Sequence, residues 1–364
     1  MPTGSTLSFT ARRWSNCTGS RAVRCECSRC LSRAGDRFRR CCPGFAGAHL
    51  EPVLLDKTAT LKKAVAAIAE AADQGARLVA FPESFIPGFP IWAALRAPIY
   101  NHELFARFVQ NSLYFDGPEI EELCRAARRH EIVVSMGFSE RNPASLGSIW
   151  NTNVLIGADG NVLSHHRKIV PTFYEKLIWT PGDGHGLRVV ATPIGRLGVL
   201  ICGENTNPLA RYTLMAEAEQ LHISTYPPLW PTRDPASGGR NYDLENAIRI
   251  RAGAHSFEAK VFNLVVSAVF AEDSAKALRS MGARAERIVA ETARGISLVI
   301  DPFGDVVGDI QRTEGIFYRT IDTDDVLEPK QFHDISGSYN RFDIFDLHID
   351  RRRVQPITIR PAAT

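Results

Sequence analysis

The fold of this chain is indicated most clearly by the stretch Arg196-Leu-Gly-Val-Leu-Ile-Cys202-Gly-Glu-Asn-Thr-Asn-Pro208. An apolar run ends abruptly at Cys202, and a glycine, a polar turn and a helix-opening proline follow it. This strand–turn–helix layout predicts a thiol at the carboxyl edge of a sheet, where clefts form in α/β proteins. The N–H of Gly203 would then be placed to stabilise a developing negative charge. Taken alone, the segment fits equally a buried cysteine that packs as a small apolar side chain.

Strands and helices alternate on both sides of this stretch, from about Glu51 onward. Apolar residues recur at helical spacing in the longer segments, and short apolar runs between them predict buried strands. Two similar hairpins, 152–163 and 296–307, suggest a repeated unit within one domain. The pattern predicts an α/β fold in which buried strands are sandwiched by helices. Besides the hairpins, strands are predicted over 77–81, 132–138, 222–225 and 261–269, and a β-rich stretch over 187–201.

Two further segments carry titratable side chains at the ends of predicted strands. Phe81-Pro82-Glu83 closes the strand 77–81, and desolvation there would raise the pKa of Glu83 into a range that suits proton transfer. His165-His166-Arg167-Lys168 follows the first hairpin, and an inward-pointing Lys168 would stabilise charge on a reacting centre. Glu83 could instead be a solvated loop glutamate, and residues 165–168 could be a solvated basic edge. A further alternative is that one of the two histidines pairs with Cys202 as a cysteine–histidine dyad.

In this order the three segments resemble the nitrilase superfamily, the carbon-nitrogen hydrolases, whose catalytic set is Glu–Lys–Cys. Phe81-Pro82-Glu83 matches the glutamate motif, His166-Arg167-Lys168 the lysine motif, and Cys202-Gly203-Glu204-Asn205 the cysteine motif of the nitrilase branch. Amidase branches more often have an aspartate where this chain has Glu204. The resemblance covers about Pro52 to the end. Further matches lie at 86–90, 117–119, 174–184, 208–212 and 338–341.

The resemblance implies a four-layer α-β-β-α sandwich, a single catalytic domain with a C-terminal tail. It implies hydrolysis of an organic nitrile to the carboxylic acid and ammonia, through a thioimidate and a thioester on Cys202. Glu83 and Lys168 would be its catalytic partners, and Glu175 would orient Lys168 or the substrate. Gly203 would be the oxyanion donor. The resemblance implies a homo-oligomer, and it implies neither a metal nor a cofactor. An amidase or a cyanide-degrading enzyme of the same superfamily is the alternative.

Four aromatic residues are candidates for binding the substrate. Phe89, Trp92, Trp150 and Tyr226 would suit an aryl or arylacetonitrile substrate, and each fits core packing equally well. The sequence leaves the class of nitrile open.

The N-terminal segment differs in composition from the rest. Residues 1–45 hold nine Arg and only two acidic residues, whereas the remaining residues have 34 basic and 38 acidic side chains. A nucleic-acid partner would have to depend on this segment alone, so none is predicted for the body. Six cysteines lie in the first 42 residues, but their spacing is not that of a zinc ribbon. A non-catalytic protein whose N-terminal segment binds metal or nucleic acid is the rival interpretation.

The sequence therefore predicts three regions. Residues 1–48 are an atypical Arg/Cys-rich segment without apolar periodicity, 49–322 the catalytic domain, and 323–364 an irregular tail and candidate oligomer contact. Residues 42–51, Cys-Pro-Gly-Phe-Ala-Gly-Ala-His-Leu-Glu, make a poor buried strand. The sequence therefore leaves open whether the chain has the first central strand of the family.

Overall composition fits a cytoplasmic enzyme. The chain is 45% hydrophobic and 23% charged, which are ordinary values for a globular enzyme. It has no apolar run of about 18 residues, so no membrane span is predicted. After residue 42 the only cysteines are Cys124 and Cys202, which fits a reducing compartment.

Overall fold

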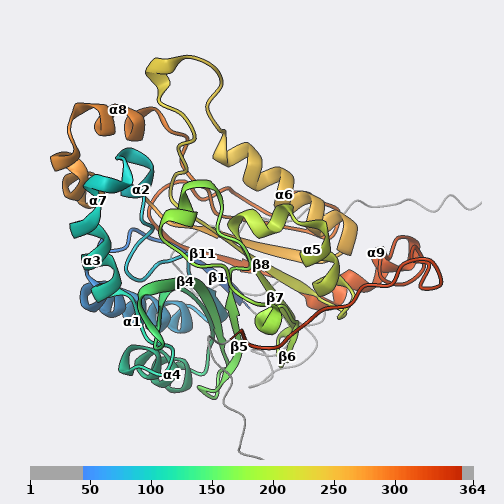
Figure 1. Ribbon diagram of the computed structural model, residues 1–364. Helices are drawn as coiled ribbons and strands as arrows, with labels where there is room; N and C mark the ends of the chain where they lie inside the picture. The colour runs from blue at the N-terminus through green and yellow to red at the C-terminus, as the bar shows by residue number, and fades with distance from the viewer. Residues whose placement is uncertain (1–43, 355–364) are drawn as a thin grey trace, which may run out of the picture. The chain divides into compact units, whose positions relative to one another are not determined.

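Two β-sheets packed face to face form the centre of the structure, a computed structural model that describes residues 44–354 (Figure 1). The first sheet has six strands in the order β11-β1-β2-β3-β4-β5, and the second has five in the order β10-β9-β8-β7-β6. The strands are β1 Gly44–His49, β2 Ala76–Ala80, β3 Val133–Asn142, β4 Ser145–Ile156, β5 Val162–Arg167, β6 Val190–Thr192, β7 Gly195–Ile201, β8 Leu221–Tyr226, β9 Phe262–Ser267, β10 Leu298–Ile300 and β11 Gly315–Thr320.

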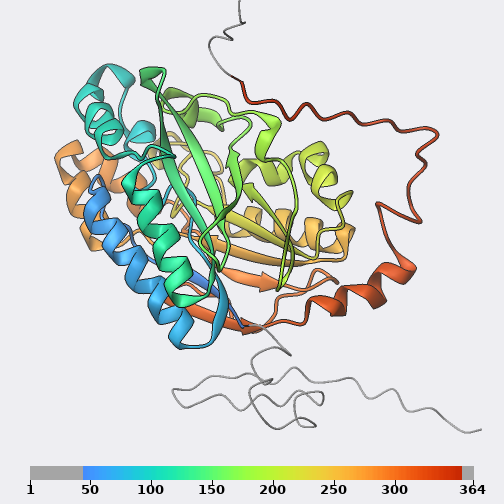
Figure 2. The same cartoon turned by 90° about the horizontal axis from the view of Figure 1, so that it is seen from below.

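Helices cover the outer faces of both sheets. The side-by-side helices α1 and α4 lie over the first sheet, and α5 and α6 lie over the second (Figure 2). Apolar side chains of the two sheets meet between them, with Leu78 and Leu155 facing Ile223 and Leu264. This is the predicted four-layer α-β-β-α sandwich. The α-helices are α1 Lys57–Asp73, α2 Trp92–Leu95, α3 His102–Asn111, α4 Pro118–His130, α5 Pro208–Met215, α6 Leu244–Ala259, α7 Glu272–Leu278, α8 Ala283–Glu291 and α9 Leu327–Phe332.

The expectation that residues 42–51 make a poor buried strand is wrong, because the first central strand is present. β1 lies inside the first sheet, antiparallel to β11 and parallel to β2. Phe45 points between the sheets, and Ala46 lies in the apolar layer under α1. Gly47 must be small, because a Cβ there would lie 2.2 Å from the ring of Phe317. The predicted boundary at residue 49 thus falls at the end of a sheet strand, and the predictions for residues 1–43 lie outside the described residues.

The first predicted hairpin is confirmed as β4 and β5, which pair antiparallel from Thr152 to Arg167. The second is shorter than predicted, because only β10 and a bridge between Ile300 and Val306 form. The tail is less irregular than predicted. It opens with η8, Thr323–Val326, and α9, since the Asp322 side chain caps η8 and Val326 is buried.

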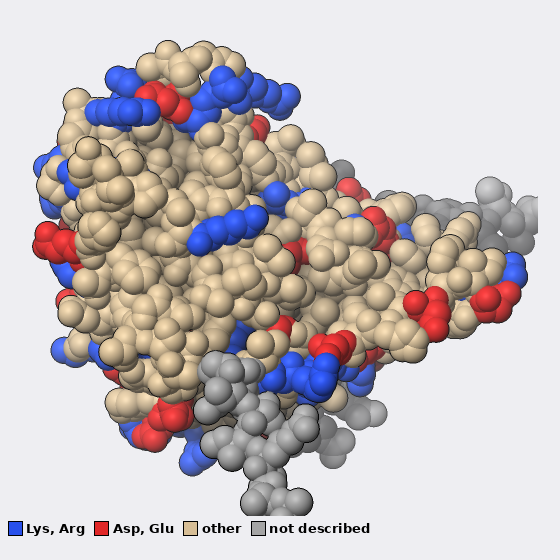
Figure 3. Space-filling view, in the orientation of Figure 1, with Lys and Arg blue, Asp and Glu red and all other residues tan. Residues whose placement is uncertain are grey.

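On the face shown in Figure 3, acidic and basic side chains of the described residues are interspersed near the rim, and much of the centre is uncharged. Within residues 44–354, no helix is both long and apolar enough to cross a membrane.

Candidate active site

Three titratable side chains from different strands meet at the junction of the two sheets. Cys202 follows β7 directly, Lys168 follows β5 directly, and Glu83 lies three residues after β2. All three side chains are buried. Each of them lies just beyond a strand end, with β2 and β5 in the first sheet and β7 in the second.

Lys168 is held between two carboxylates. Its Nζ lies 2.7 Å from Oε1 of Glu83 and 2.6 Å from Oε2 of Glu175. Glu175 belongs to the short 3-10 helix η3, Phe173–Leu177, and its side chain also accepts the N–H of Thr172 at 2.8 Å in a capping box. Asn151 on β4 donates to Oε1 of Glu83 at 2.7 Å. Both carboxylates are thereby fixed around one ammonium group.

The thiol of Cys202 lies beside this cluster. Its sulfur and one carboxylate oxygen each of Glu83 and Glu175 are all within 4.8 Å of one another. Such a set can in principle hold a metal ion, but the Lys168 ammonium already supplies the positive charge between the two carboxylates. Cys202 has φ +48°, a left-handed conformation that costs a non-glycine residue on the order of 1–3 kcal/mol. Strain at a strand-to-helix turn is typical of a nucleophile position.

The electrostatics favour a neutral thiol next to a carboxylate able to take its proton. Burial raises the pKa of Glu83 to about 7, and the charge of Glu175 adds to this while Lys168 opposes it. Burial likewise raises the pKa of the Cys202 thiol, with the charge of Glu83 adding to the effect. Although burial alone would lower it, the two carboxylates hold the pKa of Lys168 above its usual value. Lys168 therefore remains an ammonium.

Glu204 ties the lysine segment to the cysteine segment. Its Oε1 accepts the N–H of Ile169 at 2.6 Å, and its Oε2 accepts the N–H of Ile201 at 2.8 Å. His166 Nε2 lies 2.9 Å from the same Oε2. Although burial opposes ionisation, these partners hold the pKa of Glu204 below its usual range. His166 thus contacts Glu204, which disfavours the alternative of a cysteine–histidine pair.

Three of the four predicted aromatic residues lie in the same apolar cluster as Cys202. Phe89, Trp92 and Tyr226 are buried there, and Tyr226 ends β8 beside the cysteine turn. The sequence prediction missed Tyr174 and Trp230, which stack with ring centroids 5.6 Å apart. In the described part of the chain, the Tyr174 and Tyr226 hydroxyls and the Trp230 Nε1 are buried without a hydrogen-bond partner.

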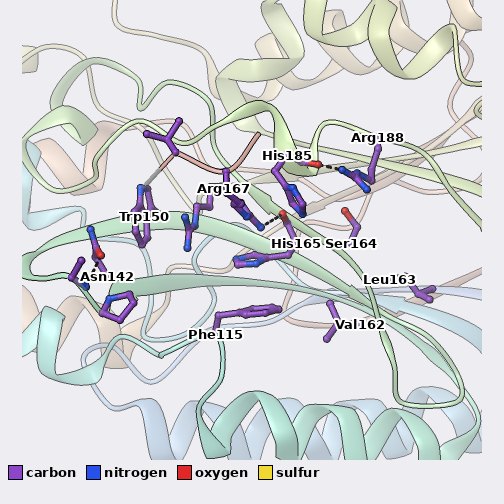
Figure 4. Close-up of a pocket in the computed structure, with 14 residues that line it drawn as sticks. Phe115, Asn142, Trp150, Val162, Leu163, Ser164, His165, Arg167, His185 and Arg188 are labelled. Atoms are coloured by element: carbon purple, nitrogen blue, oxygen red, sulfur yellow. Dashed lines mark hydrogen bonds between the residues drawn. The ribbon is translucent and has the colours of Figure 1, made fainter. Parts of the chain in front are cut away.

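Trp150 lies elsewhere. It lines a separate surface pocket of about 650 Å³, whose lining does not include Cys202, Glu83 or Lys168 (Figure 4). The guanidinium of Arg167 sits 3.6 Å from the centre of its ring. Successive side chains of β4 point to opposite faces of the sheet, so Asn151 faces Glu83 and its neighbour Trp150 faces away. The structure thus does not bring Trp150 to the cysteine.

Asn151 is a site residue that the sequence analysis did not identify. A polar run, Asn151-Thr-Asn153, interrupts a strand whose other residues from Ile149 to Ile156 are apolar and buried. Buried polar residues within an apolar strand are the sequence signal that could have identified Asn151 as a site residue.

Comparison with known proteins is consistent with this geometry. Residues 45–331 match the family described as carbon-nitrogen hydrolase. An arylacetonitrilase of Hypocrea virens is 36% identical over 87% of this chain and 93% of its own length. An aliphatic nitrilase of Rhodococcus rhodochrous is 32% identical over 86% of this chain and 84% of its own length. Among solved structures, a member of branch 10 of the nitrilase superfamily from Saccharomyces cerevisiae has a TM-score of 0.63 at 20% identity, covering 82% of this chain and 97% of its own.

Proposed function

Because the chain belongs to the carbon-nitrogen hydrolase family, we propose that it hydrolyses an organic nitrile to the carboxylic acid and ammonia, with Cys202 as nucleophile. The observation that carries the proposal is a buried thiol within 4.8 Å of two carboxylates that flank a buried ammonium. A neutral thiol needs a base, and Glu83, with its pKa near 7, is matched to that task at neutral pH.

The first step forms a carbon–sulfur bond. Glu83 takes the proton of Cys202 as the sulfur attacks the nitrile carbon, and the electron pair of the broken π bond moves to nitrogen. Lys168 and the N–H of Gly203 stabilise the negative charge that develops there. Transfer of that proton from Glu83 to the nitrogen gives a neutral thioimidate and returns Glu83 to its ionised form.

Two water molecules complete the reaction. As the first water adds to the thioimidate carbon, Glu83 relays both of its protons in turn to the nitrogen, which leaves as ammonia, and the water oxygen becomes the carbonyl oxygen of the thioester. The second water, activated in the same way, adds to the thioester carbonyl, and the Cys202 sulfur leaves with a proton. Glu175 supports these steps by holding Lys168 in place and by raising the pKa of Glu83.

We propose an arylacetonitrile as the substrate class. The aromatic cluster beside Cys202 includes Phe89, Tyr174, Tyr226 and Trp230, and an aryl group packs well against such rings. The 36% identical relative is itself named an arylacetonitrilase. Amide or cyanide as the preferred substrate would be the competing outcomes.

We also propose that the protein assembles into homo-oligomers in the cytoplasm. Large apolar side chains are exposed along the tail, and monomeric proteins seldom expose so many in one segment. They are Phe332, Tyr339, Phe342, Ile344 and Phe345. Cys124 and Cys202, the cysteines within residues 44–354, are both free, as expected in a reducing compartment. Size measured by light scattering tests the assembly.

The test is ammonia release from matched arylacetonitrile, aromatic nitrile, aliphatic nitrile, amide and cyanide substrates. The wild type is compared with Cys202→Ala, and circular dichroism establishes that both are folded. We expect acid and ammonia from the arylacetonitrile, an untouched amide, and no activity in the variant. Folded wild-type protein that stays inactive on every substrate would refute the proposal, whereas turnover of the amide or cyanide alone would reassign the substrate.

A further inference from the structure

A buried polar chain runs from the cysteine turn into the core behind it. Asn205 Nδ2 donates to the backbone carbonyl oxygens of Leu200 at 3.2 Å and of Cys202 at 3.1 Å. Its Oδ1 lies 2.9 Å from Nε2 of His222 and accepts the Ser224 hydroxyl at 3.1 Å. The amide orientation is fixed, because the reverse would point its oxygen at two carbonyl oxygens.

The chain continues to a shared carboxylate. Oε1 of Glu219 lies 2.7 Å from Nδ1 of His222, and its Oε2 lies 2.7 Å from Nε2 of His255. All three side chains are fully buried. Although burial opposes it, the two histidines hold the pKa of Glu219 at about 2, so the carboxylate accepts on both oxygens. Gly198 leaves the necessary space, because a Cβ there would lie 1.9 Å from Oε1 of Glu219.

The hydrogen-bond partners of His222 determine which of its ring nitrogens carry protons. Its Nε2 faces the amide oxygen of Asn205, which can only accept, and its Nδ1 faces the ionised Glu219, which can also only accept. Both ring nitrogens must therefore carry protons, and the ring is an imidazolium. His255 stays neutral, because burial and the charge of His222 lower its pKa to about 4.

The chain acts on the peptide group between Cys202 and Gly203. In a trans peptide the C=O and N–H point in opposite directions. Asn205 holds the Cys202 carbonyl toward the core, so the N–H of Gly203 must point away from Asn205. The same amide holds the carbonyl of Leu200, so it clamps both sides of the left-handed turn at Cys202.

We propose that Glu219, protonated His222 and Asn205 form a positioning chain that holds the Cys202 turn and aims the Gly203 N–H at the reacting nitrogen. The inference rests on the proposed function, since it assumes that Cys202 and Gly203 act on substrate. None of the three is a catalytic residue, because each acts through the backbone of the turn. Glu219, His222 and His255 are also residue types that bind zinc, but the contacts between them are already of hydrogen-bond length.

Two variants test the two hydrogen-bonded links of the positioning chain. Asn205→Asp keeps an acceptor for His222 but cannot donate to the Cys202 carbonyl, and His222→Gln removes the positive charge. A misplacement of about 1 Å near reacting atoms costs about 100-fold in rate, so we expect kcat to fall by about 10- to 100-fold with KM little changed. Alkylation of Cys202 by iodoacetamide needs no oxyanion donor, and we expect its rate to change much less than kcat.

His165→Gln is the matched control. This histidine pairs with the buried Glu140 at 2.8 Å but lies in the pocket lining on the far side of β5 from Lys168. We expect it to lower stability while leaving kcat within about 2-fold of wild type. Wild-type activity against Cys202→Ala is measured alongside, so an inactive wild type would overturn the proposed function, whereas an active wild type with unimpaired variants would overturn only the positioning chain.

The protonation state supplies a test that does not depend on folded variants. Wild-type protein with 15N-labelled histidine is examined by NMR for couplings across hydrogen bonds. We expect one ring that donates from both nitrogens, to Asn205 and to Glu219, and its signals are assigned by through-bond coupling. A full set of neutral rings would overturn the proposal, as would zinc bound stoichiometrically to the purified wild type and removed by chelator.

Discussion

Replacing Glu175 with glutamine tests the electrostatic logic of the site. With Glu83 ionised, the cluster of Glu83, Glu175 and Lys168 carries a net charge of −1, and in the variant it carries none. Ionising Glu83 thereby becomes easier, so its pKa must fall. The substitution is nearly isosteric, and the glutamine oxygen can still accept the N–H of Thr172 that closes the capping box.

The magnitude follows from the separation of the charges. The nearest oxygens of Glu83 and Glu175 are within 4.8 Å. At that distance an effective dielectric of about 20 gives a repulsion of about 3 kcal/mol, which corresponds to a pKa change of about two. The pKa of Glu83 should therefore fall from about 7 to about 5.

The assay is the pH dependence of kcat/KM for ammonia release from an uncharged nitrile. Activity requires ionised Glu83, so kcat/KM rises with pH through the pKa of that group in the free enzyme. We expect the midpoint of this rise to move from near 7 in the wild type to near 5 in Glu175→Gln. The plateau should also fall, since the partner of Lys168 loses its negative charge, so the midpoint is the diagnostic quantity.

Glu51→Gln is the control for the loss of any buried carboxylate. Glu51 accepts the backbone N–H groups of Ala271 and Ser274. Its substitution should reduce stability and leave the midpoint near 7. A midpoint that stays near 7 or rises in Glu175→Gln would show that repulsion from Glu175 does not set the pKa of Glu83, and the assignment of Glu83 as the base would lose its physical support.

Three further predictions concern the frame around the site. Phe45→Ala should lower the free energy of urea unfolding by about 3–5 kcal/mol, because it opens a cavity between the sheets, whereas Phe303→Ala, at an exposed ring, should lower it little. Gly137→Ala would place a Cβ 2.0 Å from the carbonyl of the proline in the glutamate motif; kcat should fall about 100-fold, and unaltered kcat would contradict this close approach. Gly147→Ala, with nothing within 4 Å, is its control. Glu140→Gln should cost about 3 kcal/mol at pH 7, because its histidine and arginine partners outweigh burial and hold the pKa of Glu140 at about 2. That stability is present above pH 4.5 and is lost as pH falls toward 2, so unfolding curves of wild type and variant should converge there.

The parts of the site that the sequence predicted are those encoded locally. Glu83 and Cys202 each end an apolar run, and a strand end is visible in the sequence as the point where apolar residues give way to polar ones. β2 and β7 belong to different sheets, however, so the sequence alone does not show that the two residues converge. The identity of their partners came from the resemblance of the motifs to a family.

β1 shows what a local pattern cannot reveal. The segment Gly44–His49 contains two glycines and two alanines, a composition that normally argues against a buried strand. Its small residues are required by partners distant in sequence, since the ring of Phe317 occupies the space beside Gly47. Burial between β11 and β2 supplies the stabilisation that intrinsic propensity does not.

The position of Trp150 away from Cys202 has a different cause, the register of β4. In a strand, successive side chains point to opposite faces, so a shift of one residue in register exchanges the faces. The sequence of β4 contains aromatic and polar residues that could serve either side. Only the pairing of β4 with its neighbours places Asn151 against Glu83 and sends Trp150 to the outer pocket.

Glu204 explains how residues from two separate sheets are kept at a working distance. Lys168 extends from the first sheet and Cys202 from the second, and no strand pairing joins those sheets within residues 44–354. The carboxylate of Glu204 accepts one N–H from beside each strand end, at 2.6 Å from Ile169 and 2.8 Å from Ile201. An aspartate would be shorter by one carbon–carbon bond, about 1.5 Å, and could keep both contacts only if the sheets moved closer. Glu204 therefore links the backbone beside the ammonium to the backbone beside the thiol, although the proposed mechanism gives it no step of its own.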